Sequence, residues 1–267
     1  MSMLIRDIER EYRLLPLFSD GREMYFRCPS AVKNMAKNRY SDVLPDEVTR
    51  FTVDGNPDFY YNANVVFGGI AIAAQGPRPR DRQDFWNMVW NSNSAVIIML
   101  TNFREKNKDK CSKYWPTGER TYGDITITSC EKKRLYCFPG YRECIIKRIF
   151  VAEKGGEKRV LHHYHLQNWP DWGVARPETV SALIRHVSLH NCDEKSPMIV
   201  HCSAGVGRTG VFLAAYAAWK DSKAGSMSSG IIGKKARQLR NERNKSISTF
   251  EQYVLIYKVL QQLSEAN

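Results

Sequence analysis

The chain has 267 residues, a formal net charge of +12 and seven cysteines. No linker, internal repeat or low-complexity tract divides it, and no stretch approaches the roughly 18 apolar residues of a membrane span. The charged segment Met1–Arg10 is unlike a signal peptide. We therefore expect a single domain over residues 1–267 that is monomeric and does not cross a membrane.

The predicted elements alternate between strands and helices along the chain. An amphipathic helix is expected over Ser2–Leu15, and a loop-rich stretch follows it as far as Asn38. Runs rich in β-branched residues predict strands over Val65–Ala74, Ala95–Leu100, Thr121–Cys130, Glu143–Val151, Arg159–His165 and Met198–His201. Further helices are expected over Asp81–Asn91, Arg176–Asn191, Thr209–Asp221, Ser229–Arg240 and Thr249–Ser264. This pattern predicts an α/β fold, a central twisted mixed sheet flanked by helices on both faces.

The cysteines bear on the cellular compartment. Their number is odd, and none belongs to a Cys-x-x-Cys pair, as is typical of proteins in a reducing compartment. Cys130, Cys137 and Cys144 recur every seven residues within predicted strands, and we interpret this spacing as accidental. We expect a cytoplasmic protein, with the nucleus as an alternative.

The most informative stretch is His201–Gly210, with the sequence HCSAGVGRTG. It places Cys202 and Arg208 on a glycine-rich turn between a short apolar strand and an alanine-rich helix. Unpaired N–H groups at a helix start bind anions, and the helix dipole adds partial positive charge there. The same field favours the nucleophilic thiolate form of Cys202, while Arg208 offers a planar fork to two phosphate oxygens. The stretch predicts a phosphate site with a cysteine nucleophile.

The same stretch also matches G-x-G-x-x-G, the fingerprint of a dinucleotide-binding turn, at Gly205, Gly207 and Gly210. That fingerprint requires an acidic residue about 20 residues further on, near the end of a second strand. Asp221 comes too early and directly follows the helix. A Cys-x5-Arg frame also has no role in binding a pyrophosphate. We therefore set the dinucleotide interpretation aside.

The loop resembles the signature loop of the protein tyrosine phosphatases. Other segments resemble further motifs of that family in the same order, from about residue 30 to 260: Asn38–Val43, Gln75–Pro77, Asp84–Trp90, Lys110–Pro116, Trp169–Asp171 and Glu251–Tyr253. The closest relatives are expected among protozoan members. The resemblance implies the family fold and hydrolysis of phosphotyrosine in proteins through a cysteinyl-phosphate intermediate, without a metal or another cofactor.

The resemblance also implies roles for individual residues. Cys202 is the expected nucleophile, and Asp171 is the expected proton donor and later base, on a flap that closes with Trp169 near its hinge. The expected substrate-binding residues are Ser203, Ala204, Gly205, Val206, Gly207, Arg208, Asp171, Tyr40, Asp42 and Gln252. The expected supporting residues are His201, Thr209, Glu105, Trp169 and Ser248.

The resemblance gives four of these residues a specific role. Tyr40 packs against the substrate ring, and Asp42 accepts a hydrogen bond from the peptide backbone. Thr209 donates a hydrogen bond to the leaving thiolate, and Glu105 orients Arg208. Selectivity for phosphotyrosine follows from depth, because phosphoserine and phosphothreonine are too short to reach a buried thiolate.

One position departs from the family pattern. Ser248 stands where the family has a glutamine that positions the hydrolytic water, and a serine hydroxyl is too short to reach as far. Gln252, one helical turn further on, matches a second family glutamine and could compensate. We hypothesise that hydrolysis of the intermediate is slow. The alternative function is a weakly active module that binds and traps phosphotyrosine.

Partner classes follow from charge and composition. Basic residues collect in Arg104–Lys113, Lys132–Arg134 and Lys234–Lys245 without interleaved aromatic residues. We expect solvated basic surfaces that can steer anionic phosphopeptides, and no nucleic-acid partner; association with an anionic membrane or a nucleic acid is the alternative. The histidines of the segment 162–165 have no cysteine or acid at ligand spacing beside them, so we interpret them as structural and not as a metal site.

Overall fold

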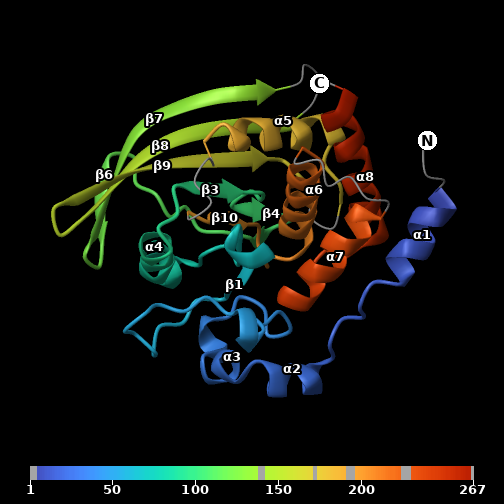
Figure 1. Ribbon diagram of the computed structural model, residues 1–267. Coiled ribbons are helices and arrows are strands. Elements are labelled where there is room, and N and C mark those ends of the chain that lie inside the picture. Colours follow the sequence, from blue (N-terminus) through green and yellow to red (C-terminus); the bar gives the residue numbers. More distant parts are fainter. Residues whose placement is uncertain (1–4, 138–141, 171–172, 191–195, 224–229, 266–267) are drawn as a thin grey trace.

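A central sheet organises the computed structural model, which describes residues 5–137, 142–170, 173–190, 196–223 and 230–265. In this part of the chain, eight strands pair in the order β1-β2-β10-β3-β9-β8-β7-β6 (Figure 1). Strands β2, β10, β3 and β9 are parallel, and the remaining pairs are antiparallel, as expected of a mixed sheet. The strands are β1 (Ala63–Val66), β2 (Ala71–Ala74), β3 (Val96–Met99), β6 (Glu119–Tyr122), β7 (Ile125–Cys137), β8 (Cys144–Lys154), β9 (Glu157–Gln167) and β10 (Met198–His201), with a separate pair β4 (Arg104–Glu105) and β5 (Lys108–Asp109).

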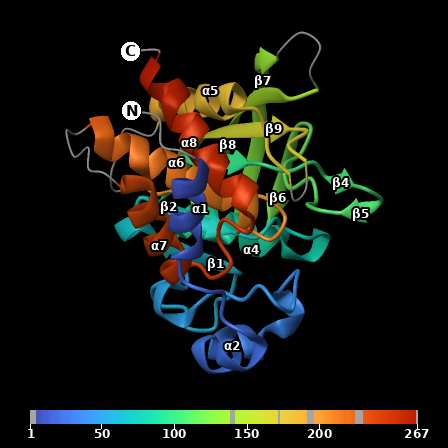
Figure 2. The same cartoon turned by 90° about the vertical axis from the view of Figure 1, so that its right-hand side faces the viewer.

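Helices cover both faces of the sheet, as predicted. They are α1 (Ile5–Arg13), α2 (Gly21–Arg27), α3 (Pro29–Lys33), α4 (Arg82–Asn91), α5 (Pro177–Ser188), α6 (Gly207–Lys223), α7 (Ile231–Glu242) and α8 (Phe250–Glu265). Short 3-10 turns occur at Met35–Lys37, Glu47–Thr49, Phe67–Gly69 and Pro79–Asp81. Figure 2 shows α1 lying against α8. Within the segments that the structure describes, no helix combines the length and the apolar character that a membrane crossing requires.

Strand β3 shows why the central strands are apolar throughout. Val96 and Ile98 pack into a core with α5, α6, α7 and α8, whereas Ile97 and Met99 pack into a second core that contains α4. Successive side chains of a strand point to opposite faces, so a strand covered on both faces needs an unbroken apolar run. The two cores hold the sheet rigidly and fix the end of β10, from which the candidate site is built.

Two predicted strands are wrong in their extent. Val65–Ala74 is an antiparallel pair, because Phe67, Gly68 and Gly69 take positive φ values and reverse the chain between β1 and β2. Thr121–Cys130 is likewise interrupted at Gly123, where φ is +66°, and the turn separates β6 from β7. The predicted loop-rich stretch before Asn38 in fact contains α2 and α3.

A disulfide joins Cys137 to Cys144. The two residues are paired across the ends of β7 and β8, so the antiparallel register brings them together. The interpretation of their spacing as accidental is therefore wrong, because it neglected that two cysteines can lie opposite each other on adjacent antiparallel strands. Disulfides are rare in reducing compartments, so this bond does not support the expected cytoplasmic or nuclear location.

Three histidines in the centre of the sheet are buried: His163, His165 and His201. Burial lowers the pKa of His201 to about 4 and that of His165 to about 3, and it holds the pKa of His163 well below its usual value. Desolvation disfavours the imidazolium form, so all three are neutral at physiological pH.

We expect the free energy of unfolding to fall when the pH is lowered from 7 to 5. These histidines titrate near 6.5 in an unfolded chain, whereas burial lowers the pKa of each in the fold, so the unfolded state takes up more protons in this window. The stability they contribute is present at pH 7 and is lost on acidification, by at least about 2 kcal/mol in total. Urea unfolding at the two pH values measures the difference, and equal free energies would contradict the assignment.

Candidate active site

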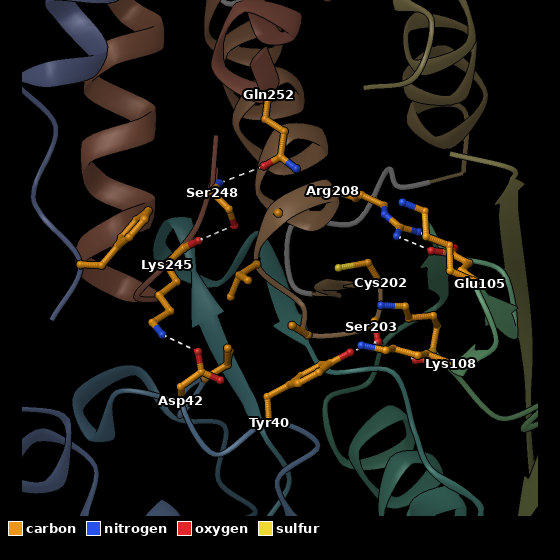
Figure 3. A pocket seen from close by; sticks show the side chains of 17 residues that line it. Tyr40, Asp42, Glu105, Lys108, Cys202, Ser203, Arg208, Lys245, Ser248 and Gln252 are labelled. Carbon is orange, nitrogen blue, oxygen red and sulfur yellow. Dashed lines mark hydrogen bonds and ion pairs between the residues drawn. The ribbon is translucent and has the colours of Figure 1, made fainter. Parts of the chain in front are cut away.

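A cavity of about 540 Å³ opens at the carboxyl end of β10, where the chain turns into α6. Figure 3 shows the Cys202 sulfur pointing into this cavity. Arg208 and Glu105 lie on one side of it, and Asp42 and Lys245 lie on the other. Because β10 lies between two parallel neighbours, the cavity sits outside the carboxyl ends of strands, the usual ligand position in open α/β sheets. The lining also includes Phe18, Tyr40, Val43, Lys106, Lys108, Lys110, Ser203, Ala204, Val206, Gly207, Ser248 and Gln252.

The loop formed by residues 202–206 has a hydrogen-bond donor for each of its carbonyl groups. The donors are His201 Nδ1 for Cys202 O (3.2 Å), Gly76 N for Ser203 O (2.9 Å), Arg243 Nη2 for Ala204 O (3.0 Å), Arg243 Nε for Gly205 O (3.1 Å), and both Gly210 N (2.9 Å) and Ile247 N (3.2 Å) for Val206 O. A trans peptide group is planar, with its N–H opposite its C=O. The carbonyls therefore point away from the cavity, and the following amides point toward it.

Glycine is required at the turn of this loop. Gly205 has φ of +74°, and a Cβ there would lie 2.1 Å from Ala74 O. Its N–H points at Cys202 Sγ at 3.2 Å, so the loop presents a backbone donor to the sulfur. A backbone donor in that position can also stabilise an anionic group bound at the sulfur.

Arg243 is a site residue that sequence analysis missed. Besides the two loop carbonyls it donates to Asn64 Oδ1 at 2.7 Å, and its side chain is 1% exposed. Burial lowers the pKa of Arg243 to about 10, which leaves it charged near neutral pH. The interpretation of Lys234–Lys245 as a solvated basic surface is thus wrong for Arg243 and also for Arg240, which is 7% exposed. Composition cannot distinguish a buried arginine from an exposed one.

Arg208 is held by the carboxylate that was expected to orient it. Its guanidinium donates to Glu105 Oε1 at 2.8 Å and to Oε2 at 2.7 Å, and to Leu100 O at 3.1 Å. Burial raises the pKa of Glu105, but the hydrogen bond and the charge of Arg208 outweigh it and the net shift is downward. Bidentate pairing fixes the plane of the guanidinium, which lines the cavity beside Cys202.

His201 lies behind the loop in a buried hydrogen-bond chain. Its Nδ1 donates to Cys202 O, so its Nε2 accepts from Tyr114 Oη at 2.9 Å. Tyr114 Oη is also 2.8 Å from His163 Nε2, which then acts as the donor. The chain fixes the tautomer of both histidines and connects the loop to β9. Sequence analysis grouped His201 with the supporting residues but did not identify Tyr114 or His163.

Tyr40 forms part of the cavity wall. Its hydroxyl is 2.9 Å from Ser203 Oγ, and Ser203 Oγ donates to Lys110 O at 2.9 Å. The Tyr40 hydroxyl is therefore the donor of the first bond. Tyr40 thus lies beside the loop that carries Cys202 (Figure 3).

Asp42 forms an ion pair at the mouth of the cavity. Its Oδ2 is 2.7 Å from Lys245 Nζ, and the side chains are 70% and 26% exposed respectively. The expected role of Asp42 in binding a peptide backbone did not include this ion pair.

Ser248 and Gln252 bind each other. Ser248 N donates to Gln252 Oε1 at 2.9 Å, and Ser248 Oγ donates to Lys245 O at 3.0 Å. The serine proton is therefore directed at a carbonyl of its own loop. Gln252 is buried, and a Cβ on Gly207 would lie 3.0 Å from its Nε2, so its amide packs against the start of α6.

Three further expectations concern the flap and α6. Asp171 lies outside the described residues. Trp169 is fully buried, and its Nε1 donates to Gly173 O at 3.1 Å. Thr209 Oγ1 is buried without a hydrogen-bond partner among the described residues, so the expected bond to the Cys202 thiolate is not formed.

Comparisons with known proteins agree with this geometry. The family model for protein-tyrosine phosphatases matches residues 34–262. Receptor-type tyrosine-protein phosphatase F of Mus musculus is 36% identical over 252 residues, which cover 90% of this chain and 13% of that protein. Receptor-type tyrosine-protein phosphatase alpha of Homo sapiens is 35% identical over 245 residues, 87% of this chain and 30% of that protein. A solved structure of PTPN18 in complex with HER2 phosphopeptides superposes with a TM-score of 0.79 at 28% identity, covering 88% of this chain and 83% of that chain. This chain therefore spans less than a third of the length of these receptor-type relatives.

We expect Arg243→Met to destabilise the fold by about 3 kcal/mol, because it leaves three buried acceptors without their donor. Arg237→Met is the matched control, since Arg237 lies on the same segment, is exposed and donates to a single acceptor among the described residues, Leu14 O. Urea unfolding of both variants measures the cost. Equal destabilisation by the two substitutions would show that Arg243 does not support the loop.

Proposed function

The chain belongs to the protein-tyrosine phosphatase family, and on this premise we propose that it hydrolyses phosphotyrosine in proteins. The observation that carries the proposal is the position of Cys202 in the cavity, with a backbone N–H 3.2 Å from its sulfur and the Arg208 guanidinium beside it. A phosphoryl group bound there would place its phosphorus at the thiolate and its oxygens against the loop amides and Arg208. The family relationship supplies the reaction class, and the geometry is compatible with it.

In the first step, the Cys202 thiolate attacks phosphorus and the bond from phosphorus to the tyrosine oxygen breaks. The leaving oxygen takes a proton from Asp171, which follows Trp169 and Pro170 in the sequence. Charge on the equatorial oxygens is stabilised by the loop amides and by Arg208, which is held in plane by Glu105. The products are tyrosine and a cysteinyl phosphate.

In the second step, water attacks the cysteinyl phosphate and Asp171 takes a proton from that water. The bond from phosphorus to sulfur breaks, so that inorganic phosphate leaves and the Cys202 thiolate is restored. No metal has a role in either step. Neutral His201 supports the loop and does not transfer a proton, because its ring nitrogens bind Cys202 O and Tyr114 Oη.

Selectivity for phosphotyrosine is proposed to follow from the depth of the site. Cys202 is 5% exposed, so the reacting atom lies below the surface. A phosphotyrosine side chain is long and rigid enough to bring its phosphate to the sulfur while its ring packs against Tyr40. The shorter phosphoserine and phosphothreonine side chains would leave the phosphate above Cys202.

A weakly active, substrate-trapping module is the second candidate, and the bonding of Ser248 favours it. Because Ser248 Oγ donates to Lys245 O, its proton is not available to orient a water molecule at the intermediate. Positioning of that water would then fall to Gln252, whose side-chain amide packs against the start of α6. The two candidates share the first chemical step and differ in the rate of the second.

Rapid mixing with a phosphotyrosine peptide in EDTA tests the proposed reaction. We expect a burst of about one dephosphorylated peptide per enzyme, followed by slower steady turnover, because formation of cysteinyl phosphate precedes a slow hydrolysis. Cys202→Ser should abolish both phases. A linear trace with fast turnover would contradict the slow second step, and absence of product from the unmodified protein would contradict the enzyme assignment.

We expect Ser248→Gln to raise the steady-state rate several-fold while leaving the burst unchanged. The longer side chain can reach a water molecule at the intermediate, which a serine cannot. Ser264→Gln, on the exposed end of α8, is the matched control. If Ser248→Gln turns over no faster than the control, hydrolysis of the intermediate is not limited at this position.

A further inference from the structure

The ion pair between Lys245 and Asp42 lies on one side of the mouth of the cavity. It joins the loop before α8 to the segment that carries Tyr40, and it lies on the side opposite Arg208 and Glu105 (Figure 3). Asp42 and Glu105 are the acidic residues of the described lining, and Glu105 is already bound to Arg208. Lys245 is thus a cation at the mouth whose partner in the described structure is Asp42.

The backbone that carries Lys245 is fixed. Lys245 has φ of +65°, which a lysine rarely adopts, and its N–H donates to Asn244 Oδ1 at 2.9 Å. Its carbonyl accepts from Ser248 Oγ. The next two carbonyls, of Ser246 and Ile247, accept from the buried Arg240 at 3.1 and 2.9 Å. The Lys245 side chain therefore starts from a constrained position and extends along one side of the cavity to Asp42.

The pair itself is easily exchanged, because Asp42 is mostly exposed and ion pairs at the surface are weak. A substrate that takes Asp42 as a backbone acceptor competes with Lys245 for the same carboxylate. A substrate carboxylate beside the phosphotyrosine would give the ammonium a new partner while Asp42 turns to the peptide. A neutral side chain at that place would not form an ion pair with Lys245.

We propose that Lys245 is a specificity-determining residue that selects phosphotyrosine peptides with an acidic side chain next to the phosphotyrosine. The inference rests on the proposed function. The subsite lies at the Asp42 side of the mouth, and the group that it recognises is a carboxylate.

The test compares kcat/KM for peptides that carry a single Glu at position −2, −1, +1 or +2 from the phosphotyrosine with the peptide that carries Gln at all four positions. For the unmodified protein we expect a Glu-to-Gln ratio of about five at one of the positions next to the phosphotyrosine. In Lys245→Met the ratio should fall to about one, and Lys245→Arg should retain most of it. A ratio near one at all four positions in the unmodified protein overturns the inference.

Lys258→Met is the control for net charge, since Lys258 is exposed on α8 and the substitution removes the same charge. Its Glu-to-Gln ratio should match that of the unmodified protein. An equal loss in both lysine variants means that overall charge attracts acidic peptides, and overturns the role of Lys245. Cleavage of every peptide with equal efficiency overturns the inference but leaves the proposed function intact, whereas cleavage of none overturns both.

Discussion

The candidate site depends on the direction in which a few peptide groups point. An anion can be held by backbone amides only if the opposite carbonyls are turned away and satisfied, because a buried carbonyl without a partner costs about as much as a hydrogen bond contributes. In the loop after β10, Arg243 satisfies two adjacent carbonyls from behind. Gly76 and His201 satisfy two more. The face that binds a ligand is therefore built largely by residues that never touch it.

The charged side chains of the cavity also differ in what they contribute to the site. Arg208 is bound by Glu105 on both carboxylate oxygens, which fixes the position of its guanidinium but offsets its charge at longer distances. The described lining also carries lysines at positions 106, 108, 110 and 245, so it has more cations than carboxylates. Partial positive charge from the start of α6 adds to this field. A dianionic phosphoryl group thus meets both a general attraction and a fixed geometry.

Much of the fold could be predicted from the sequence, because the buried strands and helices carry long apolar patterns whose period is local. The strand over Val65–Ala74 was wrong, since the reversal rests on φ angles at Phe67, Gly68 and Gly69 that hydrophobicity does not encode. The loop after β10 could be assigned to the site because its residues form a recognisable sequence motif. Arg243 could not be assigned to the site in this way, because its role depends on burial and on partners that are nearly 40 residues away in the sequence.

The interior and the mouth of the cavity differ in how strongly they are fixed. The loop, Arg208 and the Tyr114 chain are buried and bonded on several sides, so a substitution there changes the chemistry and the stability together. The Lys245–Asp42 pair is partly exposed, and within the described structure one contact, between Nζ and Oδ2, joins the two side chains. Weak contacts at a rim can exchange partners without disturbing the core beneath them. Substrate preference at this mouth can therefore vary while the geometry around Cys202 stays the same.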